Sequence, residues 1–293
     1  MYQFFSLFTG MILAFMVSAN GSLTENYDAL FAAVIIHIVG VAFATIIYIF
    51  KKEKKPFIGH YPLWFYLGGA VGVLTTVFTN FAYESISVTS IVALALFGQT
   101  VTALFIDTFG LFGMKKHSFN RATLIGFAFS IFGIILMLDN TVTKTIFAVL
   151  FAFGSGISVV LSRTINSKLS DKIGALQGSL VNHAVGLPIT IVLAFLFGSS
   201  FVINTASLTS SPWIYTGGIM GVIVVLLSNI IVPKVSAFKV TVLMFVGQLF
   251  TGIGIDIFLG NDFMDKSFIG GITISAGIII NLIIEYFSNK KLQ

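Results

Sequence analysis

Ten apolar runs, separated by short polar segments, follow one another along the chain. They cover about 3–20, 28–50, 62–83, 87–109, 119–138, 144–163, 174–197, 212–232, 236–259 and 267–287. Each is close to the ~20 residues with which a helix crosses roughly 30 Å of hydrocarbon. Strands are not expected, because an isolated strand in lipid leaves backbone groups unpaired and the runs lack the alternation of a transmembrane β-barrel. The pattern predicts an all-α membrane protein with ten transmembrane helices.

The composition agrees with a lipid environment. The chain is 57% hydrophobic and 9% charged, whereas a soluble domain carries about 25% charged residues. Its 28 Gly residues suit close helix packing in membranes. The net charge of +5 does not indicate a nucleic-acid partner, because Lys and Arg lie between or beside the apolar runs. The absence of Cys excludes disulfides, thiolate metal sites and cysteine nucleophiles.

The basic residues are divided unequally between the two sides of the predicted bundle. If successive runs alternate in direction, 14 of the 16 Lys and Arg residues fall on one side: Lys51, Lys52, Lys54, Lys55, Lys115, Lys116, Arg121, Arg163, Lys168, Lys172, Lys234, Lys239, Lys290 and Lys291. Only Lys144 and Lys266 fall on the other. Basic residues concentrate on the cytoplasmic side of membrane proteins. The distribution predicts a multi-pass protein of the cell (inner) membrane with both termini in the cytoplasm.

The chain repeats itself. At an offset of 146 residues, Gly10, Asn20, His37 and Gly40 correspond to Gly156, Asn166, His183 and Gly186. At an offset of 149, Trp64, Gly68, Gly69, Gly72, Gln99, Thr102 and Asp107 correspond to Trp213, Gly217, Gly218, Gly221, Gln248, Thr251 and Asp256. Each copy holds five runs, and an odd number makes the second copy enter the membrane upside down. We therefore expect two inverted five-helix repeats, 1–140 and 141–293, with a binding site between them near the midplane, as in secondary transporters.

Two motifs point to a family. The first is Trp64-x-x-x-Gly68-Gly69-x-x-Gly72, and the second is Gly98-Gln99 followed by Ile106-Asp107-x-Phe109-Gly110. Both recur in the second copy, except that Leu259 replaces the final Gly. With its five-plus-five arrangement, the chain resembles the drug/metabolite transporter superfamily, and within it the fused form of the YdcZ-type inner-membrane exporters. The resemblance implies export or uptake of a small metabolite. The first-helix Glu of the small multidrug-resistance branch has no counterpart here.

Six polar residues are expected deep in the bilayer, where such groups are costly and face a cavity or a partner helix. They are His37, Gln99, Thr102, His183, Gln248 and Thr251. Gathered between the repeats, they would offer donors and acceptors without a fixed charge, which suits a neutral, zwitterionic or weakly charged solute. The alternative is that they form hydrogen bonds between helices.

Two further expectations concern ionisable groups. Asp107 and Asp256 lie near the C-terminal ends of their runs, where a carboxylate opposes the helix dipole. They are candidate gate residues at opposite mouths, or else they extend into the headgroup layer. The two histidines are candidate proton carriers, because modest changes of environment alter imidazole protonation near neutral pH. Their alternative role is to bridge helices as neutral rings.

These patterns favour a secondary transporter that moves a small solute through the bilayer by alternating access. A membrane-embedded enzyme is the alternative from another class, but it would need asymmetric acid/base or metal groups. A lipid-carrier flippase is a variant of transport. No phosphate-binding loop or spaced set of metal ligands is present in the sequence, so no metal or cofactor is expected. The protein is expected to be a monomer or a homodimer.

The predicted topology can be tested by cysteine labelling, since the chain provides a background without Cys. A cysteine replacing Glu25 or Glu84 should react with an impermeant thiol reagent in intact cells. A cysteine replacing Lys54 should react only after the cells are permeabilised. The opposite labelling pattern would show that the orientation is wrong.

Overall fold

The computed structural model describes residues 1–83, 85–86, 88–117, 120–143, 145–198, 212–259 and 266–290, with some side chains in these ranges, that of Asp256 among them, left undescribed. Ten α-helices occur in these ranges: α1 (Tyr2–Asn26), α2 (Ala29–Phe50), α3 (Gly68–Tyr83), α4 (Val88–Phe109), α5 (Arg121–Met137), α6 (Ile146–Ile173), α7 (Ala175–Phe197), α8 (Thr216–Ile231), α9 (Ala237–Leu259) and α10 (Lys266–Lys290). Short 3₁₀ turns occur at η1 (Leu63–Leu67), η2 (Leu111–Gly113), η3 (Asn140–Thr143) and η5 (Pro212–Tyr215).

The described residues are helical at each of the ten predicted runs, so the all-α fold is confirmed. Seven described segments are long and apolar enough to cross a membrane, by length and composition. Three more are apolar but shorter: Leu63–Thr79, Arg121–Met137 and Phe268–Ile284. The fold is thus that of a multi-pass membrane protein.

The helices turn their large apolar side chains outward. Phe4, Phe195 and Ile257 are 67%, 88% and 54% exposed. The buried positions include many small or polar residues, such as Ser6 and Ser155. A water-soluble protein has the reverse distribution. This surface therefore fits lipid, while small side chains let the helices approach one another.

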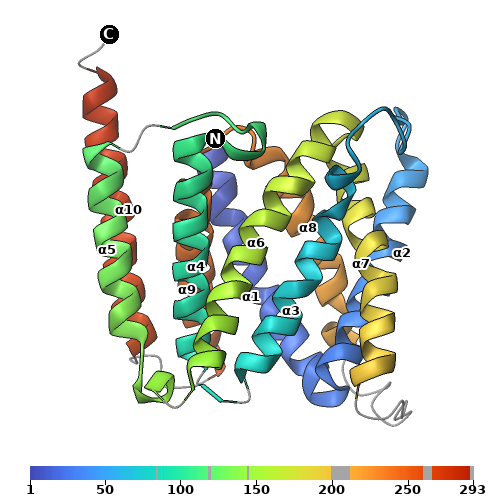
Figure 1. Ribbon diagram of the computed structural model, residues 1–293, viewed down its shortest axis with the longest axis horizontal. Coiled ribbons are helices and arrows are strands. Elements are labelled where there is room, and N and C mark those ends of the chain that lie inside the picture. The colour runs from blue at the N-terminus through green and yellow to red at the C-terminus, as the bar shows by residue number, and fades with distance from the viewer. Residues whose placement is uncertain are drawn as a thin grey trace.

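Figure 1 shows α5 and α10 together at one edge of the bundle, α2 and α7 at the other, and the remaining six helices between them. The helices α5 and α10 pack on each other, as do α2 and α7. The start of α1 and the end of α10 lie at the same end of the bundle (Figure 1). The connections from α2 to α3 and from α4 to α5, which carry most of the loop lysines, lie at that end too (Figure 1).

The central helices exchange partners between the two halves of the chain. From the first half, α1 packs on α9 and α8; from the second half, α6 packs on α4 and α3. The closest approaches are at glycines. Gly10 of α1 lies against the backbone of Met244 in α9, and Gly156 of α6 lies against the backbone of Ala95 in α4. Neither position has room for a Cβ, so these crossings depend on glycine.

The helix α6 is longer than its apolar run. The predicted span ended at 163, whereas the helix continues to Ile173. Gly174, with φ of 97°, then turns the chain directly into α7. The prediction was wrong here because it ended the span at a polar segment. That segment is largely buried, with Thr164, Asn166 and Ser167 packed inside the protein. A helix surrounded by other helices does not need an apolar sequence on every face.

Candidate functional site

The two predicted histidines lie together between α2 and α7. The ring centroids of His37 and His183 are 5.8 Å apart, and the His183 side chain is only 4% exposed. Each Nδ1 bonds a carbonyl one turn earlier in its own helix, that of Ala33 at 2.8 Å and that of Ser179 at 2.9 Å. A carbonyl oxygen only accepts, so each Nδ1 carries the proton. In the neutral rings, Nε2 is therefore a hydrogen-bond acceptor.

Each histidine ring packs over a glycine of the other helix. The ring of His37 lies against Gly186, and that of His183 lies against Gly40. In both helices the glycine follows the histidine by three residues, so a His-x-x-Gly segment of α2 interlocks with one of α7. A Cβ at either glycine would collide with the opposing ring. The pair therefore joins the two halves of the chain.

Gln99 binds a cation that the sequence analysis did not place in the interior. Nη2 of Arg163, on α6, donates to Oε1 of Gln99, on α4, at 3.3 Å. Gln99 lies near the middle of α4, and Arg163 lies ten residues before the end of α6. The expectation that every Lys and Arg lies between or beside the apolar runs is thus wrong for Arg163. Arg163 was misplaced because the predicted sixth span ended at residue 163.

A separate hydrogen-bonded network beside Arg163 joins α6 to α7 and α3. Asn166, one turn after Arg163, donates from Nδ2 to Oδ1 of Asn182 on α7 at 2.7 Å and to Oγ of Ser162 at 3.3 Å. Ser162 in turn donates to the Gly68 carbonyl at 2.7 Å. Asn182 directly precedes His183 in the chain. Apolar periodicity could not reveal this network, because its members interrupt the apolar runs.

The other predicted polar residues are half-buried: Thr102 on α4, and Gln248 and Thr251 on α9. Their side chains have no hydrogen-bond partner among the described residues. The helices α2 and α7 pack mainly on each other and on α1, α3, α6 and α8, whereas both Gln residues belong to α4 and α9. The six candidates therefore occupy two neighbouring regions instead of a single cluster.

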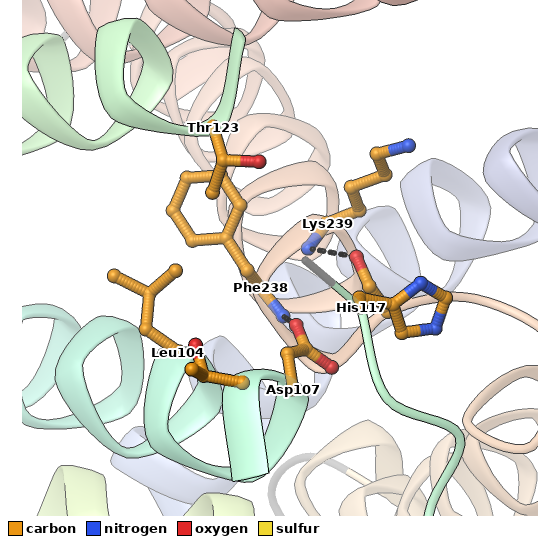
Figure 2. Close-up of a pocket in the computed structure, with 8 residues that line it drawn as sticks. Leu104, Asp107, His117, Thr123, Phe238 and Lys239 are labelled. Atoms are coloured by element: carbon orange, nitrogen blue, oxygen red, sulfur yellow. Dashed lines mark hydrogen bonds between the residues drawn. The ribbon is translucent and has the colours of Figure 1, made fainter. Parts of the chain in front are cut away.

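Asp107 of α4 contacts the backbone at the start of α9 and so joins the two halves; Figure 2 shows its carboxylate beside Phe238. Its carboxylate, 5% exposed, accepts the backbone N–H of Ala237 at 2.8 Å and that of Phe238 at 2.9 Å. These are the first two residues of α9, whose amides have no partner within the helix. Asp107, at the end of α4, thus caps the start of α9. A carboxylate is favourable at such an N-terminus, and this offsets its unfavourable position at the end of its own helix.

A small pocket adjoins this cap. Figure 2 shows Asp107, His117, Thr123 and Lys239 around it. It lies beside the end of α4 and not between the histidines, so we treat it as part of the α4–α9 contact and not as a solute site. The side chain of Asp256, the counterpart of Asp107 in the second half, lies outside the described part of the chain.

The comparisons with known proteins identify the family. Residues 1–136 and 147–280 match the family described as "Putative inner membrane exporter, YdcZ". The chain belongs to this YdcZ family. The resemblance inferred from the glycine and Gly-Gln motifs is therefore confirmed, and two matched segments agree with a fused, two-repeat form. Membership makes the protein an inner-membrane transporter and favours transport over enzymatic activity.

Solved structures add evidence on the fold alone. No curated protein matches the chain, but 26 chains of solved structures do. One of them, described only as "Crystal structure of protein", has a TM-score of 0.72 at 12% sequence identity. The alignment covers 96% of the YdcZ-family chain and 97% of that structure. At this low identity the likeness supports the arrangement of the helices and says nothing about the solute.

The Asp107 cap leads to a stability prediction. In Asp107→Asn, the amide nitrogen cannot accept, so one buried N–H of α9 loses its partner. Such a loss costs about 1–3 kcal/mol, and the unfolding temperature of the purified protein should fall. Asp171→Asn is the matched control, because Asp171 is exposed on α6, and it should unfold like the parent. Equal stability of the Asp107 variant and the parent would contradict the capping role.

Proposed function

We propose that this YdcZ-family protein exports a small solute by alternating access between two inverted five-helix repeats, 1–140 and 141–293. The observation that carries the proposal is that contacts between the halves occur in pairs with the roles exchanged. His37 of α2 lies over Gly186 of α7, while its repeat counterpart His183 lies over Gly40. A two-fold relation between the halves would generate such pairs.

The same exchange is found among the central helices. Asn20 of α1 lies against Gly217 at the start of α8, and its counterpart Asn166 of α6 lies against Gly68 at the start of α3. The crossing of α1 with α9 corresponds likewise to that of α6 with α4. Exchanged packing of this kind supports an interface between the proposed repeats along the centre of the bundle, which is where inverted-repeat transporters bind their solutes.

Contacts between the halves occur at both ends of this interface. At one end, the hydroxyl groups of Tyr27 and Tyr215 are 2.8 Å apart and share a hydrogen bond. At the other end, Asp107 caps α9 and Lys168 donates to the Gly113 carbonyl at 2.7 Å. Alternating access requires one set to open while the other stays closed. In this proposal Asp107 is a gate contact, and Asp256 has the corresponding role at the opposite mouth.

The solute site is assigned to the polar residues along the interface: Gln99, Thr102, Gln248 and Thr251, with His37 and His183 beside them. Gln248 is the most informative of these, because its amide is half-buried and lacks a hydrogen-bond partner among the described residues. An amide whose donors and acceptor are not used in hydrogen bonds between helices is available to bind solute.

The test is a panel of metabolites, amines, amino acids and lipid carriers, ranked by the rise in unfolding temperature that each causes. A small water-soluble compound should rank first, and Gln248→Leu should weaken its apparent affinity with little change in the stability of the free protein. A lost neutral hydrogen bond costs about 0.5–1.5 kcal/mol, which is roughly a two- to tenfold change. Stabilisation by lipid carriers alone would indicate a flippase, and unchanged affinity with lower stability would make Gln248 structural.

The histidine pair is proposed to carry the coupling proton. With both Nδ1 atoms donating to carbonyls, the two Nε2 atoms are the positions left for a proton. The rings are 5.8 Å apart, so two imidazolium charges would repel each other strongly in the interior. The pair should therefore take up one proton per cycle at most. In proteoliposomes, His37→Gln and His183→Gln should each flatten the pH dependence of transport of the top-ranked compound. Parental pH profiles in both variants would exclude the role.

A further inference from the structure

Arg163 is an interior cation with a neutral partner. Within the described part of the chain, its one hydrogen bond is to the Gln99 amide oxygen, and none of the described carboxylates forms an ion pair with it. The nearest acid along α6, Asp171, is exposed two turns later. A charge held within a membrane helix bundle without a counter-ion is costly, and such residues mark solute or ion pathways. We therefore expect the positive charge of Arg163 to have a binding partner that associates and dissociates reversibly.

Packing does not require a cation at this position. At the 146-residue offset, the counterpart of Arg163 in α1 is Val17. Its neighbour Ser162 corresponds to Met16, and the two lie in equivalent places: Ser162 beside Gly72, and Met16 beside Gly221. Asn182 corresponds to Ile36. The first half thus has apolar residues at the positions where the second half has Ser, Arg and Asn, and Val17 is itself 50% exposed. Close packing at these positions therefore does not require polar side chains, so the polarity on the α6–α7 side serves another purpose.

The donors at this position match an anion. A guanidinium only donates, so the group it bonds on Gln99 is the amide oxygen, and Nε2 of Gln99 is left with two N–H donors. Together with the remaining N–H groups of Arg163, these form a set of donors. Both side chains are half-buried, so neither is sealed by packing. The planar fork of Arg fits the two oxygens of a carboxylate.

We propose that the transported solute is a small organic anion whose carboxylate binds Arg163 and Gln99. This inference rests on the proposed transport function and narrows its solute class. It also replaces the expectation of a site without fixed charge, which assumed that Arg163 lies outside the interior. Gln99 would both orient the guanidinium and donate to the bound anion.

Matched pairs of compounds test the charge directly. The purified protein is heated with acetate or acetamide, lactate or lactamide, succinate or succinamide, and benzoate or benzamide, with inorganic phosphate and choline as further arms. At least one carboxylate should raise the unfolding temperature while its amide does not. Arg163→Gln should weaken that carboxylate at least about tenfold, as expected for a lost charge-assisted hydrogen bond. Arg163→Lys, which keeps the charge but loses the fork, should weaken it less.

The control is Arg121→Gln, because Arg121 is the other arginine of the chain and is exposed at the start of α5. It should bind the carboxylate like the parent. The proposal is overturned if no carboxylate stabilises the protein, if amides act as well as carboxylates, if only phosphate acts, or if both Arg163 variants keep parental affinity. Stabilisation by choline or neutral compounds alone would leave the transport function standing and remove only the anionic solute.

Discussion

The two halves of this protein meet where the backbone of one helix touches a glycine of another. In lipid the hydrophobic effect does not drive helices together, so association depends on close packing and on polar contacts between helices. Gly10 against Met244, and Gly156 against Ala95, bring α1 to α9 and α6 to α4 at backbone distance. Because each half supplies one helix of each crossing, the central packing of each half depends on the other half.

The histidine pair is also packed against glycines, but here side chains instead of backbone fill the space above them. Two rings fill the space over Gly40 and Gly186, so α2 and α7 interlock through contacts that need both rings in place. This gives His37 and His183 a packing role even if they also bind protons. Arg163 differs from them, because an apolar residue occupies the equivalent place in the first half. Polar residues that occur at matching positions in both halves are suited to a role that both halves share, such as helix packing or movement. Polar residues that occur in only one half are suited to recognition of a particular solute.

Most of the fold could be predicted from the sequence, since apolar runs of membrane length can only be satisfied as helices and the repeated motifs reveal two related halves. The site could be predicted less well. The histidine pairing follows from matching positions in the two copies, but Arg163 was placed at a helix end because the polar segment after it resembles a loop. Its burial depends on the neighbouring helices α3, α4 and α7, which hydropathy does not describe. Asp107 accepts from the backbone of another helix, and a contact to backbone amides cannot be recognised from a pattern of side chains in the sequence.

In the proposed transport cycle, the two ends of the interface between the halves open alternately. Distances between pairs of spin labels, measured by pulsed electron paramagnetic resonance in lipid nanodiscs, distinguish this cycle from a static bundle. One label pair replaces the exposed residues Asn26 and Trp213 near the Tyr27–Tyr215 contact, and the other replaces Lys116 and Lys172 at the opposite end. Alternating opening should give two populations whose proportions change with solute or pH, with the distance in one label pair increasing as the distance in the other decreases. A single unchanging distance at both ends, or a simultaneous increase at both ends, would be incompatible with alternating access.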